Sequence, residues 1–132
     1  MADQPAHRPY TAEDLGLDDE LTSIDVDPQL VQVDRVHYQR PRSEEKVLAL
    51  MNNPEAREAH PVLIGVRKSG SLLSVDGQHR LEAAMRLGDE SVPARAFLSD
   101  GWKQERDVYL RLAQFHEAMH TQTTSDGDGD AG

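Results

Sequence analysis

The sequence predicts a single domain that combines helices with β-strands, an α+β (α/β) sandwich. Stretches with alternating apolar residues and stretches with helical apolar spacing follow one another in the order strand, helix, hairpin, helix, strand, helix. A chain of 132 residues is also long enough to bury one hydrophobic core. We therefore expect a compact domain over residues 31–120, between an acidic N-terminal arm (1–30) and an acidic tail (121–132).

The first half of this domain is expected to contain one strand and one helix. Apolar residues alternate over 31–36, which is typical of a short strand. Pro41 biases the preceding residue away from helix, so residues 38–42 are expected to be irregular. Ser43 is the predicted N-cap of a helix whose first turn carries Glu44 and Glu45, and this helix should stop near Pro54.

The second half of the domain is expected to contain a hairpin, a helix, a strand and a final helix. Residues 62–67 and 72–75 read as two strands joined by the polar turn 68–71. A helix over about 78–87 should end at Gly88, which is a typical C-terminal cap. Residues 92–98 form the next strand, predicted at a sheet edge because Pro93 cannot donate a ladder hydrogen bond. Residues 100–119 form the last helix.

The net charge of −10 resides at the two ends of the chain. Residues 1–30 carry eight acidic side chains against one arginine, residues 121–132 carry three aspartates, and residues 31–120 hold thirteen charges of each sign. Acidic segments with few aromatic residues tend to stay solvated, so we expect a partly disordered arm and a disordered tail. Weak or no duplex DNA binding is expected from a neutral body, whereas acidic arms suit a basic protein partner.

Cysteine is absent, and this excludes thiol catalysis, disulfides and cysteine-ligated zinc. The sequence shows neither the apolar stretch of a signal peptide nor a run of membrane-spanning length. We therefore expect a cytoplasmic protein without a membrane partner.

The segment Asp76-Gly-Gln-His-Arg80 stands where a predicted strand ends and a helix begins. N–H groups without an intrahelical acceptor and the positive end of the helix dipole favour an anion at such a point. His79 and Arg80 add side-chain donors in the first turn. Asp76 is expected either to cap the helix or to hold Mg²⁺ through water. An ordinary turn, in which Arg80 pairs with a surface carboxylate, is the alternative.

The segment Val75-Asp-Gly-Gln-His-Arg-Leu-Glu-Ala-Ala84 resembles the signature turn of the ParB/sulfiredoxin superfamily. Three further segments resemble that family's other motifs: Tyr38-Gln-Arg-Pro-Arg42, Pro61–Val66 and Gly88–Phe97. The similarity spans roughly residues 31–119 and is greatest to compact ParB-like proteins of bacteria and their phages. It implies a small mixed sheet flanked by helices.

Superfamily members include nucleotide-gated DNA clamps, a cysteine-dependent sulfinic acid reductase, a free-serine kinase and nucleases. The resemblance implies that a nucleotide phosphate is held by Gly77, Gln78, His79 and Arg80, with Arg40 and Arg42 approaching from the upstream loop. The implied cofactor is Mg²⁺ with ATP or CTP. Gln78 stands at the position of the sulfiredoxin cysteine, which excludes sulfinic acid reduction. No helix-turn-helix pattern follows in this sequence, so a sequence-specific DNA clamp is not expected.

The leading hypothesis is a ParB-like nucleotide-binding domain that hydrolyses or transfers a phosphoryl group by charge stabilisation. Glu44 is the candidate general base, because its carboxylate follows the Arg40/Arg42 loop. Two alternatives stay open: a nuclease acting on DNA or RNA, and a non-enzymatic phage- or plasmid-type interaction protein that uses the same scaffold.

His116-Glu-Ala-Met-His120 matches the H-E-x-x-H zinc motif. Catalytic zinc normally has a third protein ligand, and only aspartates of a Gly-rich segment follow this motif. We therefore expect no zinc. Asp126–Asp130 resembles the start of a calcium loop but lacks the glutamate that would complete one.

Overall fold

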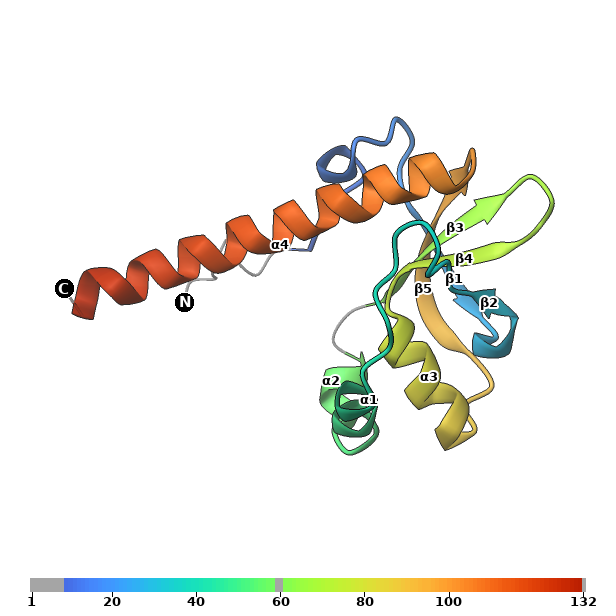
Figure 1. The fold of residues 1–132 in the computed structure, drawn as a ribbon, viewed down its shortest axis with the longest axis horizontal. Helices are drawn as coiled ribbons and strands as arrows, with labels where there is room; N and C mark the ends of the chain where they lie inside the picture. Colours follow the sequence, from blue (N-terminus) through green and yellow to red (C-terminus); the bar gives the residue numbers. More distant parts are fainter. Residues whose placement is uncertain (1–8, 59–60, 132) are drawn as a thin grey trace.

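The computed structural model describes residues 9–58 and 61–131, and in them a five-stranded mixed sheet lies between helices (Figure 1). The strand order is β1-β5-β3-β4-β2. β1 pairs antiparallel with β5 and β3 pairs antiparallel with β4, whereas β3/β5 and β2/β4 are parallel pairs. The strands are β1 Thr22–Val26, β2 Val31–Gln32, β3 Val62–Arg67, β4 Leu72–Asp76 and β5 Val92–Ser99. The helices are α1 Glu44–Met51, α2 Pro54–Glu58, α3 Gln78–Leu87 and α4 Trp102–Ala131, with short 3₁₀ turns η2 Glu13–Leu15 and η3 Pro28–Leu30. This architecture confirms the predicted α+β class.

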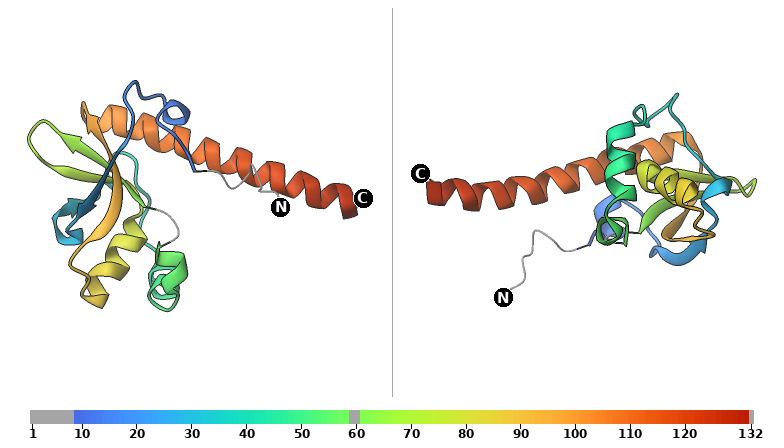
Figure 2. Two further views of the ribbon diagram at one scale, coloured as in Figure 1. Left: turned by 180° about the vertical axis from the view of Figure 1, so that it is seen from behind. Right: turned by 90° about the horizontal axis from the view of Figure 1, so that it is seen from below.

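Alternation along β3 divides the core between two helical layers. Ile64 is buried with Leu81 of α3 on one face of the sheet. Leu63 is buried with Val108 and Leu112 of α4 on the other face. The α1 and α2 helices lie on the α3 side, and α4 crosses the opposite side (Figures 1 and 2). Side chains that alternate along a strand point to opposite faces, so one strand serves both cores.

The β1 strand was not expected from the sequence. It pairs along β5 and forms an edge of the sheet, so the sheet begins before residue 31, where the start of the domain was predicted. Of its residues only Val26 is buried, and so the strand shows little apolar alternation. The edge position predicted for β5 from Pro93 is wrong, since β5 lies between β1 and β3 with Pro93 opposite Asp25.

Three further boundaries differ from expectation. The predicted strand over 31–36 is reduced to Val31–Gln32, because Asp34 accepts hydrogen bonds from the N–H groups of Val36 and His37 and turns the chain. Pro54 begins α2, a position where its missing N–H costs nothing. The α4 helix continues beyond Met119 to Ala131. The flexibility expected of residues 121–132 stays a prediction.

A buried carboxylate ties the start of α4 to the sheet. Glu105 has 0% exposure and accepts hydrogen bonds from Arg67 Nε (2.9 Å) and Nη2 (2.7 Å), from Tyr38 Oη (3.0 Å) and from Ser99 Oγ. Burial alone would raise the pKa of Glu105, but the hydrogen bonds from Arg67, Ser99 and Tyr38 outweigh it and lower that pKa. The ionised carboxylate therefore joins α4 to β3, to β5 and to the loop that follows β2.

Throughout the part of the chain that the structure describes, no helix combines the length and apolarity needed to span a membrane.

Candidate functional site

Gly77 makes the turn between β4 and α3. Its φ of 108° is in the left-handed region, and a Cβ at this position would lie 2.9 Å from Val62 Cγ1. Only glycine avoids both the strained backbone and this contact. As the N-cap of α3, Gly77 leaves the helix without a side-chain cap. The first-turn N–H groups lie at the positive end of the helix dipole, and Gly77 has no side chain that could bind them.

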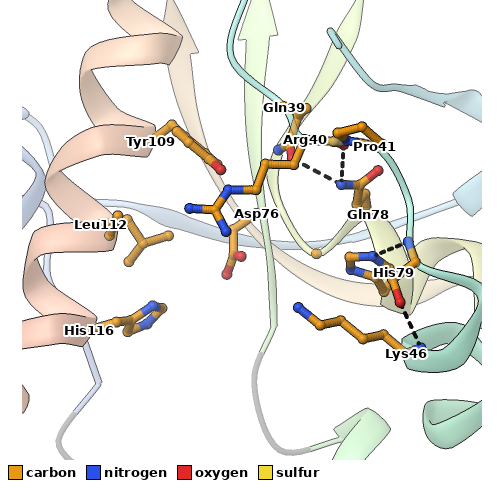
Figure 3. Close-up of a pocket in the computed structure, with 13 residues that line it drawn as sticks. Gln39, Arg40, Pro41, Lys46, Asp76, Gln78, His79, Tyr109, Leu112 and His116 are labelled. Carbon is orange, nitrogen blue, oxygen red and sulfur yellow. Dashed lines mark hydrogen bonds between the residues drawn. The ribbon is translucent and has the colours of Figure 1, made fainter. Parts of the chain in front are cut away.

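A pocket of about 370 Å³ lies in front of this turn (Figure 3). It has three walls. The turn itself forms the first, the loop after β2 together with α1 forms the second, and one face of α4 forms the third. In chain order the lining residues are Gln39, Arg40, Pro41, Ser43, Lys46, Asp76, Gly77, Gln78, His79, Tyr109, Leu112, Ala113 and His116.

The pocket carries positive charge although the chain as a whole is acidic. The side chains of Arg40 and Lys46 reach into the space between the turn and α4 (Figure 3). No ion pair between described residues involves either of these cations. Asp76 is the one carboxylate among the described lining residues. An anion entering here therefore meets a helix N-terminus and two available cations.

His79 is held as a neutral ring. Its Nε2 accepts a hydrogen bond from the Ser43 backbone N–H at 3.0 Å, which assigns the ring proton to Nδ1. Burial and the nearby charges of Lys46, Arg42 and Arg35 lower the pKa of His79, against an opposing effect of Asp76. The ring thus links α3 to the N-terminus of α1 and keeps one N–H donor.

Gln78 joins the upstream loop to the turn. Its side-chain amide donates to the Arg40 carbonyl oxygen (2.9 Å) and to Gln39 Oε1 (3.3 Å), and accepts from Arg35 Nη2 (3.0 Å). Gln39 in turn donates to the carbonyl oxygens of Ser74 and Val75. A glutamate at position 78 could not donate to the Arg40 carbonyl. The Gln78 side chain therefore positions the loop that carries Gln39 and Arg40.

Two candidates from the upstream segment do not line the pocket. Arg42 forms an ion pair with Glu82 of α3 at 3.2 Å. Glu44 binds Arg86 with both carboxylate oxygens, and this hydrogen-bonded pair lowers the pKa of Glu44. Glu44 links α1 to α3, and Arg42 links the loop before α1 to the same helix, so the structure does not place Glu44 as a general base at this site.

Arg80 also lies outside the pocket. It is 8% exposed and lines a separate depression of about 270 Å³ with Arg57, Asp89 and Ser91. Successive residues of an α-helix are rotated by about 100°, because a turn holds 3.6 residues, and this rotation directs Arg80 to the second depression while His79 lines the pocket. Adjacency in the motif had suggested that they act together.

Several lining residues were not identified from the sequence. Lys46 follows the Ser43 N-cap by one helical turn, a spacing that could have identified it. Tyr109, Leu112 and His116 line the pocket from α4, a helix for which the sequence analysis considered only the zinc motif that includes His116. His116 lines the pocket, whereas the His120 side chain is outside the described residues. Among those that are described, no group of three potential metal-ligating side chains is present, and the absence of zinc stays a prediction.

No family model and no curated protein sequence matches the chain. Solved structures do match. The chain is similar to the ParB chromosome-partitioning protein of Caulobacter crescentus complexed with CTP-γ-S (22% identity, 70% of this chain, 52% of that chain, TM-score 0.54). It is also similar to the same protein complexed to the centromeric parS site (18% identity, 80% of this chain, 58% of that chain, TM-score 0.52). A third similar structure is a Pnob8-like ParB-N domain (18% identity, 67% of this chain, 34% of that chain, TM-score 0.50).

The matched region spans about half the length of the Caulobacter ParB chain. Identities of this size establish the fold and not the activity. The three matches cover between 67% and 80% of this chain. The chain therefore has the ParB/sulfiredoxin-like fold that its Gly-Gln-His-Arg turn implied.

Proposed function

We propose that this protein binds a nucleotide, with the phosphates at the N-terminus of α3 between Arg40 and Lys46. The observation that carries the proposal is the convergence of an uncapped helix N-terminus and two cations on one pocket in an otherwise acidic protein. Phosphate binding at such a helix terminus is a recurrent arrangement. A ParB protein of the same fold is complexed with CTP-γ-S, which supports a nucleotide over a simple anion.

The remaining pocket wall suits the nucleoside. Tyr109, Leu112 and Ala113 present aromatic and apolar surface from α4, opposite the turn. The volume of about 370 Å³ is within the range of small-ligand sites. We place the sugar and base against α4, where His116 supplies a polar group.

Mg²⁺ fits this pocket only together with the nucleotide. It is commonly bound by one or two carboxylates plus substrate phosphates. Asp76 supplies one carboxylate, and the described residues offer no cluster that would hold the ion alone. Asp76 is therefore the proposed protein ligand, direct or through water, and the ion would offset the charge of the phosphates.

Phosphohydrolase or phosphotransfer activity has a weaker basis than binding. Arg40 and Lys46 lie where they can stabilise charge on a phosphoryl group, which is the main catalytic contribution in such reactions. Glu44 is bonded to Arg86 and does not line the pocket. Among the described lining residues, Asp76 is then the carboxylate that could act on a bound phosphoryl group. We propose binding as the primary function and any turnover as slow.

Titration calorimetry with ATP, CTP, GTP and UTP, with and without Mg²⁺, tests the proposal. Lys46→Ala removes one charge-assisted contact, so affinity should fall by about tenfold or more, from a loss of about 1.5–3 kcal/mol. Lys68→Ala is the matched control, because it removes the same charge from the β3–β4 hairpin turn. Absence of binding by every nucleotide, or an equal loss in both variants, would overturn the proposal.

A further inference from the structure

A second cavity lies at the far end of the sheet and shares no lining residue with the nucleotide pocket. It measures about 530 Å³ and lies where the segment before β1 passes the ends of β3 and β5. We call it the β1 groove. Its apolar lining includes Ile24 of β1, Val66 of β3, and Ala96 and Leu98 of β5.

One apolar residue of the β1 groove, Leu98, is left uncovered by the fold, whereas its other apolar lining residues are half-buried or buried. Leu98 is 79% exposed, the second-highest exposure among the large exposed apolar side chains of the described residues. Strand register places Leu98 beside Val66, and Val66 beside Leu72 of β4, so apolar side chains continue across three neighbouring strands. β1 begins at Thr22, opposite Ala96, and therefore does not extend alongside Leu98. We take this row of half-buried apolar side chains, which ends in the exposed Leu98, as the apolar part of an interaction surface.

Four carboxylates surround this apolar surface. Asp18, Asp19, Glu20 and Asp100 all line the β1 groove and are exposed. In the described part of the chain, none of the four takes part in an ion pair. A like-charged cluster without internal cations is electrostatically suited to a cationic ligand.

We infer that the β1 groove binds a basic segment of another protein, with an apolar side chain seated on Ile24, Val66 and Leu98 and its cations on the surrounding carboxylates. Charge complementarity selects this occupant. A second copy of the chain would bring a net charge of −10 to an acidic surface, and residues 121–132 contain aspartates and no cation. Nucleic acid and anionic lipid are repelled for the same reason. β1 is also an edge strand, so an extended segment can pair with its free side.

The same features have a second interpretation, in which the carboxylates only protect an edge strand from aggregation. That interpretation requires no ligand. The two are distinguished by a short synthetic peptide that alternates lysine with valine, compared with a lysine–serine peptide of equal charge and a glutamate–valine peptide of equal apolarity. Binding to the full chain is measured by fluorescence anisotropy.

We expect saturable binding of the lysine–valine peptide alone. Leu98→Ser should abolish its preference over the lysine–serine peptide. Neutralising Asp18, Asp19 and Glu20 together should weaken binding by about tenfold, since each exposed charge pair contributes modestly. The matched control neutralises the exposed Glu45, Glu55 and Glu90, which gives the same net charge and should leave binding unchanged.

Three outcomes overturn the inference. The first is the absence of binding of the lysine–valine peptide at concentrations up to about 1 mM, which means a Kd weaker than about 1 mM. The second is equal binding of both lysine peptides, or equal weakening in both triple variants, which would indicate general charge attraction. The third is dimerisation in analytical ultracentrifugation that Leu98→Ser removes, which would assign the surface to a second copy. None of these bears on the nucleotide titration.

Discussion

Gly77 links backbone conformation to the candidate site more directly than any other residue. Its left-handed φ turns the chain sharply at the end of β4, and Val62 of the neighbouring strand occupies the space that a side chain would need. The turn thereby brings the N–H groups of α3 to the pocket. A substitution at this position should therefore affect folding as well as binding.

Gly77→Ala should lower the free energy of unfolding by about 2–4 kcal/mol, from left-handed strain of about 1–2 kcal/mol plus overpacking against Val62. Gly70→Ala is the matched control, because Gly70 has a φ of 94° but no atom within 4 Å of the position that a Cβ would take. It should lose only the strain, about 1–2 kcal/mol. Urea unfolding of both variants measures the difference, and equal losses would show that the Val62 contact is unimportant.

His79 should titrate below the ordinary histidine pKa of about 6.5. Burial and the surrounding cations disfavour its charged form in the folded state. Between the folded pKa and about 6.5 the unfolded chain therefore binds more protons, so the His79 contribution to stability falls as pH drops through this window and is constant above it. NMR titration of the ring measures the pKa, and inorganic phosphate should raise it. A value above about 6.5 without ligand would contradict the neutral assignment.

At the residue scale, the sequence predicted the features that depend on local backbone conformation. It did not predict which side chains form ion pairs with residues distant in the sequence. The turn at Gly77 followed from a strand, a glycine and a helix start, and the Ser43 N-cap was confirmed. The sequence did not indicate that Arg42 and Arg80 lie outside the lining of the pocket at the turn. Arg42 is paired with Glu82, which is 40 positions away in the sequence, and no local sequence pattern predicts such a pair.

At the element scale, α4 forms one wall of the pocket, and its position depends on the buried Glu105. This carboxylate is bonded to β3, to β5 and to the loop that carries Gln39 and Arg40. The site is therefore assembled from segments that are distant in sequence. Of these segments, the turn and the loop were recognised from the sequence, whereas the contribution of α4 was not.

Glu105→Gln should lower the free energy of unfolding by about 1.5–3 kcal/mol, because hydrogen bonds to a charged group are lost. The full cost of a buried pair is not expected, since the Arg67 side chain is 30% exposed. Asp107→Asn is the control on the same helix. Its pair with Arg111 is exposed on both sides and should contribute only about 0.2–0.5 kcal/mol. Chemical denaturation compares the variants, and equal effects would show that Glu105 does not anchor α4.

The elements that sequence reasoning missed share a physical cause. β1 buries a single side chain and α2 is five residues long, so neither has the apolar periodicity on which prediction depends. Both are held by neighbours already in place, β5 for the strand and α1 for the helix. The longer elements α1, β3, β4 and α3 carry their own patterns and were predicted closely.

At the scale of the whole molecule, charge is divided between a locally cationic pocket and a net charge of −10. A nucleotide places its charges within one pocket, whereas duplex DNA needs phosphate contacts over a broad basic face. The acidic side chains of the β1 groove also repel the phosphates of nucleic acid.

The protein should therefore bind a nucleoside triphosphate more tightly than duplex DNA at physiological salt. Fluorescence anisotropy with a labelled duplex, beside calorimetry with the nucleotide, measures both affinities in one buffer. Tighter binding of the duplex, with a steep decrease as salt rises, would favour the nuclease alternative instead.

The central claim, that phosphates are held at the N-terminus of α3, is tested most directly by an amide NMR titration with CTP and Mg²⁺. We predict that the N–H signals of Gly77, Gln78 and His79 shift most, and that those of Lys46 and Tyr109 follow. Signals of the β3–β4 hairpin turn, 68–71, should stay unchanged. Saturable shifts centred on Arg80 and the depression beside it, or on no part of α3, would contradict the claim.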